Sequence, residues 1–423
     1  MVFVLLFHIV KYFVRAVARG DTHTLRSSVK RMEIVTPESV GMSASRLNEI
    51  DTAMQAFIDQ GKFAGIATLI ARYGKVAHFG CYGKLDLALD KPIQADSLFR
   101  IQSLTKPITA VAVLMLHDEG YFDLDDPVSK WVPEFKNFKV MKDSTDINSE
   151  LVDLEKEITF RHLLTHTSGL CYGFKEISTD PIDEIYRDAQ IIDSIAILLL
   201  PLQEIIQKLT KLPLATQPGT RFRYSLAYDV LGYLVGLISG KPFDVFLRER
   251  IFEPLGMHDT SFVVPQGKIE RFGPLYSAPG ENGLSVLDDV ATSAHIRPDK
   301  VLSGGGGLVS SMPDYLRFML MLANGGELCG VRILKPDTVT EMTTNQLGAN
   351  MGGPHFGAQQ QGYGLGVGVS VAGAPRFGWL GISGTMAWFY PRKEMLVMAM
   401  PQALFNFEAS DTLLRMAREV IAT

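Results

Sequence analysis

Hydrophobic residues near the start of the chain recur at the spacing of a helix. Between Ser43 and Gln60 they fall at Leu47, Ile50, Met54 and Phe57, three or four residues apart. This spacing places them on one face of a helix, so we expect an amphipathic helix over this segment.

Strand patterns follow this helix. Residues 64–73 and 75–82 are rich in Ile, Val, Phe and Tyr, and they meet at Tyr73-Gly74, so we expect a β-hairpin. Near the C-terminus, a last helix is expected from Ser410 toward Ile421. It is preceded by three further strand-like runs, at residues 362–371, 386–391 and 395–400.

A second helix pattern begins at Ser103 and is expected to end at Gly120. Its hydrophobic positions repeat on one side of a helix and predict a buried stripe. They are Ile108, Val111, Ala112, Met115 and Leu116.

The middle of the chain has a different pattern. From Asp125 to about Pro279, short helical stretches such as residues 191–212 and 229–238 are separated by polar connections that contain proline. We therefore expect an α/β domain built from both chain ends, with the active site in the cleft between domains. The expected parts are an N-terminal extension (1–35), an α/β domain (36–130 and 285–423) and a mainly helical domain (131–284).

The composition indicates a folded globular protein. Of the 423 residues, 47% are hydrophobic and 21% are charged, close to the average of soluble proteins. The net charge of -5 and the lack of a basic stripe exclude a nucleic-acid partner. The three cysteines lie far apart, which favours a reduced, cytoplasmic setting, and neither they nor the histidines show metal-ligand spacing. We assign no metal and no cofactor, and the sequence gives no expectation for the oligomeric state.

The first 20 residues allow three interpretations. Residues 1–17 are largely hydrophobic, while His8, Lys11, Arg15 and Arg19 recur at helical spacing. A membrane span needs about 20 nearly uninterrupted hydrophobic residues, so this segment is suited to an amphipathic helix at a membrane surface instead. An export signal cleaved near residues 16–18 is the second interpretation, and an extension without a role in the fold is the third. Membrane association is expected only through residues 1–20.

Candidate chemistry begins with Ser103 and Lys106. Residues three apart at the start of a helix share a face, so the hydroxyl and the amine lie within reach of each other. A serine hydroxyl becomes a nucleophile when a neighbouring base takes its proton, and a lysine can be that base. Pro107 is tolerated only in the first helical turn, which fixes the start of the helix. An isolated pair of this kind is often only a helix cap beside a surface lysine, but the buried stripe that follows favours catalysis.

The segment Ser103-Leu104-Thr105-Lys106-Pro107 resembles the nucleophile motif of family VIII carboxylesterases, which belong with class C β-lactamases and penicillin-binding proteins. The resemblance extends from about Pro37 to the C-terminus. Further matching segments are His162 to Leu170, Pro218 to Thr220, Tyr224-Ser225 and Gly304 to Gly307. The resemblance implies an α/β, β-lactamase-like fold: an antiparallel sheet flanked by helices, with an inserted mainly helical domain.

The resemblance also implies further site residues. Tyr224 matches the family's tyrosine, which exchanges protons with the serine and the leaving group. The oxyanion hole would consist of the backbone N–H groups of Ser103 and Ile382.

Three more positions are expected to contact the substrate: Leu226, Trp379 and Gly381. Leu226 stands where the β-lactamases carry asparagine, and Trp379 stands where they carry the lysine of Lys-Thr-Gly. Tryptophan offers an apolar wall and one N–H donor in place of a cation. These differences favour neutral esters over β-lactams.

Together these residues predict a carboxylesterase that hydrolyses short to medium acyl esters of small molecules, with Lys106 and Tyr224 as base and acid for Ser103. One alternative is a β-lactamase or a DD-peptidase, an activity that could also be present as a weak side reaction of the esterase. A further alternative is an acyltransferase. A non-catalytic protein is disfavoured by the intact Ser103, Lys106 and Tyr224 set. The localisation is expected to be cytoplasmic, with membrane association or export through the N-terminal segment as the alternative.

A Ser-His-Asp triad is disfavoured. No G-x-S-x-G occurs, because the segment around Ser383 ends in Thr385. Ser383 and His166 are therefore expected to be structural, and Asp229 is expected to cap the helix that follows it.

We expect a shortened chain that begins at Met32 to hydrolyse p-nitrophenyl butyrate with unchanged kcat/KM, because every recognised motif lies after that residue. An inactive or insoluble shortened chain would contradict the interpretation of the preceding residues as an extension without a role in the fold.

Overall fold

The computed structural model describes residues 34–174, 178, 180–192, 198–356 and 359–421. The expectations for residues 1–20 lie outside the described residues. The predicted domain boundaries stay predictions.

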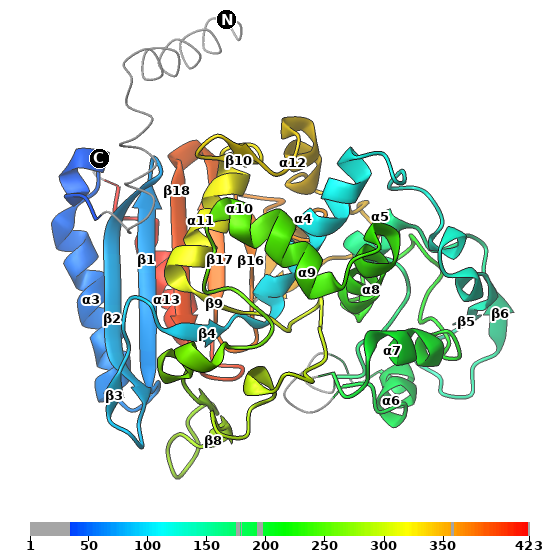
Figure 1. Cartoon of the computed structure of the whole chain (residues 1–423), viewed down its shortest axis with the longest axis horizontal. Helices are drawn as coiled ribbons and strands as arrows, with labels where there is room; N and C mark the ends of the chain where they lie inside the picture. The colour runs from blue at the N-terminus through cyan, green and yellow to red at the C-terminus, as the bar shows by residue number, and fades with distance from the viewer. Residues whose placement is uncertain (1–33, 175–177, 179, 193–197, 357–358, 422–423) are drawn as a thin grey trace, which may run out of the picture.

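An eight-stranded antiparallel sheet forms one half of the molecule (Figure 1). Its strand order is β14-β15-β16-β17-β18-β1-β2-β3. In that order the strands are Gly362–Tyr363, Gly368–Val369, Phe377–Leu380, Met386–Tyr390, Met395–Pro401, Gly65–Arg72, Lys75–Asp86 and Lys91–Pro92. Strand β1 pairs with β18, so that Ile66 lies opposite Pro401 and Arg72 lies opposite Met395. The two ends of the chain therefore meet in the middle of the sheet, as blue and red strands side by side in Figure 1.

The N-terminal helix and hairpin are confirmed. Helix α3 (Ala44–Asp59) buries Leu47, Ile50, Met54 and Phe57, the four predicted positions. The hairpin of β1 and β2 turns at Tyr73 and Gly74, whose φ angles of 53° and 73° are those of a tight two-residue turn.

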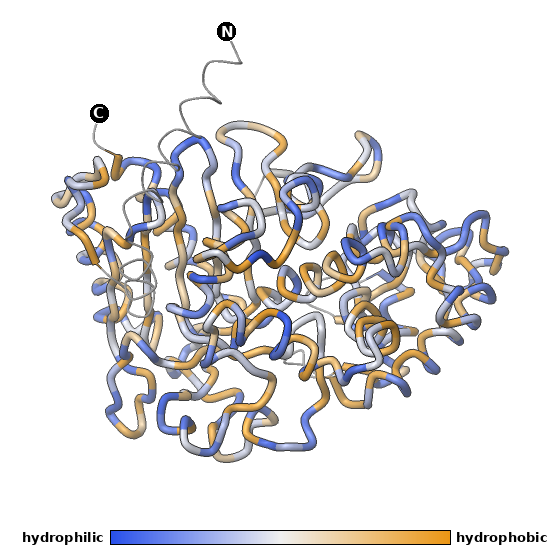
Figure 2. Tube along the Cα trace, turned by 45° about the horizontal axis from the view of Figure 1, so that its top comes forward, coloured by the Kyte–Doolittle hydropathy of each residue, from blue (hydrophilic) through white to orange (hydrophobic). Residues whose placement is uncertain are grey.

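The two faces of the sheet are covered by different helices, because successive strand residues point to opposite sides. On β18, Met395, Val397 and Ala399 join the core under α3 and α13 (Glu408–Ala417), whereas the alternate residues Leu396 and Met398 join the larger core on the other side. That larger core contains α4 (Thr105–Asp118) and α11 (Met312–Ala323). Figure 2 shows hydrophobic segments through the middle of the molecule and hydrophilic segments in many of the outer loops.

The helical part lies beside the sheet (Figure 1). Its helices are α5 (Phe160–Leu164), α6 (Pro181–Asp188), α7 (Leu202–Leu209), α8 (Ala227–Ser239), α9 (Phe243–Leu247) and α10 (Glu253–Leu255). Helix α8 packs against both α5 and α4, the helix that begins just after Ser103. This packing joins the helical part to the segment that carries Ser103 and Lys106. Among the described residues no single helix has the length and hydrophobicity of a membrane span, although α8 and the segment Phe243–Leu255, bent by 81°, pass that test as a pair.

The extent of the helical stretch predicted at residues 191–212 is wrong. Helix α7 covers only Leu202–Leu209, and Ile192 pairs with Leu198 in an isolated β-bridge. Pro201 explains the late start, because proline disfavours a helical conformation in the residue before it.

Short elements complete the structure. Helix α12 spans Pro336–Met342. The small strand pairs are β4 (Leu98–Arg100) with β9 (Val309–Ser311), β5 (Lys139–Met141) with β6 (Leu151–Asp153), β7 (Leu275–Tyr276) with β8 (Val286–Asp288), β10 (Glu327–Leu328) with β11 (Val331–Arg332), and β12 (His355–Phe356) with β13 (Gln359–Gln360).

We expect Leu69→Ala to lower the free energy of unfolding by about 2–5 kcal/mol, because Leu69 lies fully buried on the central strand β1 and its truncation leaves a cavity. Leu89→Ala is the matched control, since Leu89 is 74% exposed, and we expect a change below about 0.5 kcal/mol. Urea unfolding followed by circular dichroism measures both. Equal losses in the two variants would contradict the assignment of β1 to the core.

Candidate active site

Ser103 lies in a short 3-10 turn, Gln102–Leu104, between strand β4 and helix α4. The residue before it, Gln102, has a φ of 48°, a left-handed conformation that costs energy for a residue with a Cβ atom. Two residues before Ser103 are held by hydrogen bonds from later in the chain. Ser383 Oγ donates to Arg100 O at 3.0 Å, and Thr385 Oγ1 donates to Ile101 O at 3.2 Å. The nucleophile candidate is thus anchored to the connection between strands β16 and β17.

Lys106 has no exposed surface, and its amine faces the candidate nucleophile. Lys106 Nζ donates to Ser103 Oγ at 3.1 Å and to Gly305 O at 2.7 Å. The structure therefore brings Ser103 and Lys106 into the hydrogen-bonded contact that a nucleophile and its base require.

Aromatic rings enclose the amine. Lys106 Nζ lies 4.5 Å from the ring centroid of Tyr224 and 5.5 Å from that of Tyr172, distances at which the ring faces attract a cation. Tyr172 stacks on Tyr224 with ring centroids 5.7 Å apart. The Tyr224 hydroxyl accepts from Trp379 Nε1 at 3.3 Å, and among the described residues no hydrogen bond joins it to Ser103 or Lys106. Tyr224 is thus adjacent to the pair, and its role in proton exchange stays a prediction.

Asp229 positions the glycine-rich turn that receives the lysine. Its Oδ1 accepts from Ser303 Oγ at 2.6 Å and from Gly305 N at 3.1 Å, while Gly305 O accepts from Lys106. A Cβ atom at Gly305 would lie 2.9 Å from Asp229 Oδ2, so glycine lets the turn approach this closely. Burial raises the pKa of Asp229, and the Ser303 hydroxyl and nearby Lys106 oppose that rise.

The expectation that Asp229 caps the following helix is wrong. The residue at the N-cap of α8 is Leu226, and within the described part of the chain no side chain caps the start of this helix. The carboxylate points toward the turn at Ser303 and Gly305 instead, because those groups offer it two donors.

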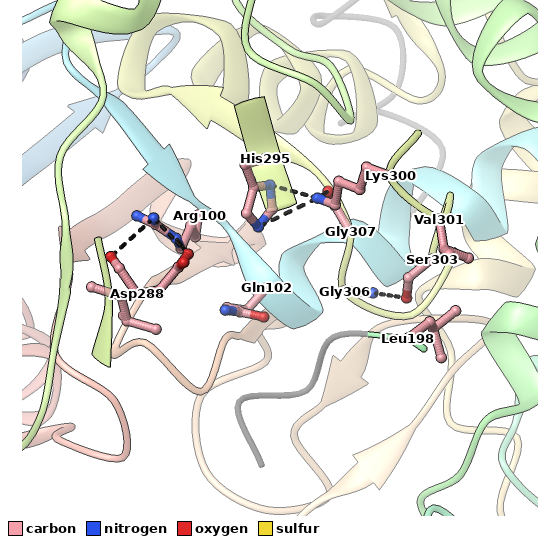
Figure 3. A pocket seen from close by; sticks show the side chains of 11 residues that line it. Arg100, Gln102, Leu198, Asp288, His295, Lys300, Val301, Ser303, Gly306 and Gly307 are labelled. Atoms are coloured by element: carbon pink, nitrogen blue, oxygen red, sulfur yellow. Dashed lines mark hydrogen bonds and ion pairs between the residues drawn. The ribbon is translucent and has the colours of Figure 1, made fainter. Parts of the chain in front are cut away.

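A second buried cluster holds the same turn from its other end (Figure 3). Lys300 Nζ donates to Gly307 O at 2.6 Å and lies 2.5 Å from His295 Nδ1. Burial lowers the pKa of Lys300 well below its usual range, and burial together with Lys300 lowers the pKa of His295. Close by, Arg100 pairs with Asp288 through Nη2 and Oδ2 at 2.7 Å. These polar contacts fix the turn and the segment before Ser103 in place.

The segment Trp379-Leu380-Gly381 packs directly against the residues that precede Ser103. A Cβ atom at Gly381 would lie 2.6 Å from Ile101 O and 3.0 Å from Gln102 Cβ, so only glycine permits this contact. The Gly381 N–H donates to Thr385 O at 2.7 Å, whereas the Ile382 N–H has no backbone acceptor among the described residues. Ile382 is thus available as an oxyanion donor, a role that stays a prediction.

The predicted substrate residues differ in exposure. The side chain of Leu226 belongs to the large core and has no exposed surface, so it can reach a substrate only through its neighbours. Trp379 is 3% exposed and contacts Tyr224 and the edge of Tyr363. The indole is therefore part of the aromatic wall around the amine.

His166 is fully buried, as expected for a structural histidine. Its Nδ1 lies 3.1 Å from Ser225 Oγ, and its Nε2 has no hydrogen-bond partner among the residues that the structure describes. Burial, assisted by Lys106, lowers the pKa of His166 well below its usual range, so the ring is neutral. It packs against Tyr224 with ring centroids 4.6 Å apart, which braces that tyrosine.

Three contributors were missed by sequence reasoning: Tyr172, the carbonyl of Gly305 and the true role of Asp229. A signal existed only for Asp229, which is an acid in an otherwise hydrophobic helix segment and therefore needs a buried partner. Tyr172 lies two residues beyond the matched His162 to Leu170 segment, and the carbonyl of a glycine has no sequence signal.

The fold and the buried serine–lysine pair together define a serine hydrolase of the β-lactamase fold. A model of the beta-lactamase family matches residues 50–420, and the chain belongs to that family.

Comparisons with individual proteins agree. The chain is 31% identical over 379 residues to esterase EstB of Burkholderia gladioli, covering 83% of this chain and 88% of EstB. It is 35% identical over 339 residues to Protein Rv1367c of Mycobacterium tuberculosis, covering 78% and 81%. The solved structure of EstCE1, a hydrolase with promiscuous acyltransferase activity, superposes with a TM-score of 0.74 at 26% identity, covering 90% of this chain and 99% of EstCE1. The resemblance to family VIII esterases is confirmed.

We expect Asp229→Ala to slow covalent labelling of Ser103 by a fluorophosphonate about 10-fold or more, because Gly305 loses the acceptor that orients its carbonyl toward Lys106. Asp229→Asn, which keeps an acceptor oxygen, should recover most of the rate. The labelling rate is measured by intact-protein mass spectrometry.

The control is Asp314→Ala, which removes a buried carboxylate bonded to Asp259 N and Thr260 Oγ1, and which should label at the unaltered rate. Labelling of Asp229→Ala as fast as the unaltered chain would contradict the positioning role. If Asp229→Asn were as slow as Asp229→Ala, charge rather than position would be the contribution of Asp229.

Proposed function

We propose that the chain is a carboxylesterase that hydrolyses short to medium acyl esters through an acyl-enzyme on Ser103. The observation that carries this proposal is the contact of 3.1 Å between Lys106 Nζ and Ser103 Oγ, made by a lysine without exposed surface. A buried amine held against a hydroxyl is suited to proton transfer, because no solvent competes for the same hydrogen bond.

In the acylation step, Ser103 Oγ attacks the ester carbonyl carbon and its proton passes to the Lys106 and Tyr224 pair. The carbonyl oxygen becomes an oxyanion, for which the Ser103 and Ile382 N–H groups are the proposed donors. When the tetrahedral intermediate collapses, the bond to the alcohol oxygen breaks and the pair returns the proton to that oxygen. The alcohol leaves, and the acyl group stays on Ser103.

Deacylation repeats these steps with water as the nucleophile. The pair accepts a proton from water as the water oxygen attacks the acyl carbon, and it then returns a proton to Ser103 Oγ. The carboxylic acid is released. Gly305 O fixes the amine throughout, because it accepts a second hydrogen bond from Lys106 Nζ at 2.7 Å.

The preference for neutral esters follows from the aromatic wall. Trp379 stands where a β-lactamase presents a lysine, and its indole N–H donates to Tyr224, so this position offers no cation to a substrate carboxylate. The relative EstB is named an esterase, which supports the same assignment. Activity on β-lactams is proposed only as a weak side reaction.

An acyltransferase is the second candidate. EstCE1 is described as a hydrolase with promiscuous acyltransferase activity, and the same acyl-enzyme serves both reactions. Transfer differs from hydrolysis only in that an alcohol replaces water in the second half-reaction.

We expect the chain to hydrolyse p-nitrophenyl butyrate with a kcat/KM well above that for nitrocefin. We expect Ser103→Ala to lower kcat more than about 1,000-fold, because among the described residues Ser103 supplies the hydroxyl that is hydrogen-bonded to Lys106 Nζ. A series of p-nitrophenyl esters from acetate to palmitate measures the size of the acyl pocket. Adding an alcohol and quantifying the new ester by chromatography measures transfer.

Ser285→Ala is the matched control, since Ser285 is exposed and its hydroxyl takes part in none of the site contacts described above, and it should be fully active. Unchanged ester turnover in Ser103→Ala would refute the mechanism. Nitrocefin turnover that rivals ester turnover would assign the chain to the penicillin-recognising enzymes instead.

A further inference from the structure

A large cavity lies on the side of the sheet that faces away from Lys106. Its volume is about 520 Å³, within the range of small-molecule sites. Its apolar wall consists of Leu380 on β16, Met386 and Trp388 on β17, Phe407 at the start of α13 and Leu414 within α13.

The cavity is separate from the catalytic site. Trp379 and Leu380 are consecutive residues of β16, so their side chains point to opposite faces of the sheet. Trp379 belongs to the core around the nucleophile helix, whereas Leu380 packs with the core under α3 and α13. One strand therefore forms a wall of both sites.

Three arginines converge on this apolar cavity: Arg376, Arg415 and Arg418. Among the described residues none of the three forms an ion pair, although the chain as a whole has a net charge of -5. The guanidinium of Arg376 lies 4.2 Å from the ring centroid of Trp388, which orients it along the apolar wall. Among the described residues that line this cavity Asp411 is the one acid, so cations outnumber carboxylates there.

A neighbouring cavity of about 410 Å³ shares Gln361, Arg376 and Arg418 with the first and adds Lys393. Gln361 is 6% exposed, and its Oε1 has no hydrogen-bond partner within the described ranges. The cationic rim and the apolar wall therefore meet at one place.

We propose that this cavity binds an anionic amphiphile, namely a medium-chain fatty carboxylate. The carboxylate lies among Arg376, Arg415 and Arg418, because guanidinium groups pair with carboxylates through two parallel hydrogen bonds. The hydrocarbon tail packs against Trp388, Met386 and Leu414, where burial removes apolar surface from water. The inference does not depend on the reaction at Ser103.

Isothermal titration of the full chain with decanoate tests the proposal. We expect one molecule to bind per chain, and we expect the double variant Arg415→Gln/Arg418→Gln to bind at least about 10-fold more weakly, because two charged partners of the head group are lost. Both arginines are exposed on or beside α13, so the variant should keep its melting temperature and its ester turnover. Decanol, which has the same tail without the charge, should bind the unaltered chain more weakly than decanoate.

The matched control is Arg297→Gln/Arg332→Gln, which removes two arginines with side chains 61% and 46% exposed that line neither cavity, and which should bind decanoate as the unaltered chain does. Equal decanoate affinity in the two double variants would overturn the proposal, because the ligand would then occupy another site such as the catalytic cleft. Decanol binding as tight as decanoate binding would also overturn it, because the arginines would then not recognise the head group.

Discussion

The burial of the Lys106 amine is the constraint on which the rest of the site depends. A cation-forming group without exposed surface must recover the hydrogen bonds that it loses to water. Lys106 recovers two of them, one from Ser103 Oγ and one from Gly305 O, and the faces of Tyr224 and Tyr172 supply further attraction. Ser103 lies on the same turn as Lys106, whereas Gly305 and the two tyrosines come from distant segments. The amine is therefore satisfied only when helix α4, the glycine-rich turn and the helical part are assembled together.

This constraint explains the buried polar groups around the site. Asp229 and Lys300 hold the turn that carries Gly305, and Arg100, paired with Asp288, holds the segment that carries Ser103. Such polar groups are costly to bury. Their common effect is to hold the backbone of the glycine-rich turn and of the segment before Ser103 in fixed positions through hydrogen bonds. In an active site this accuracy is worth more than the stability that hydrophobic residues would supply at the same positions.

The sequence predicted the parts of the site that depend on local geometry. Ser103 and Lys106 are three positions apart, a separation that brings their side chains together on one turn. The spacing of the hydrophobic residues from Leu47 to Phe57 is enough to define α3. The contact between Lys106 and Gly305 spans 199 residues and involves a carbonyl that every residue possesses, so no pattern reveals it. Asp229 was misassigned because the N-terminus of a helix favours acids whether or not they cap it, and the helix expected before Pro201 failed because its hydrophobic residues allow more than one local structure.

The pairing of β1 with β18 has a consequence for folding during synthesis. Arg100 O accepts a hydrogen bond from Ser383, which lies 283 residues later in the sequence. Strand β18, the partner of β1, is synthesised after Ser383. While the ribosome works through the helical part, the β1–β2 hairpin has no neighbour on its β18 side and exposes an open edge. A chain of this topology must therefore protect that edge, by a chaperone or by a transient structure of its own, until the last strands emerge.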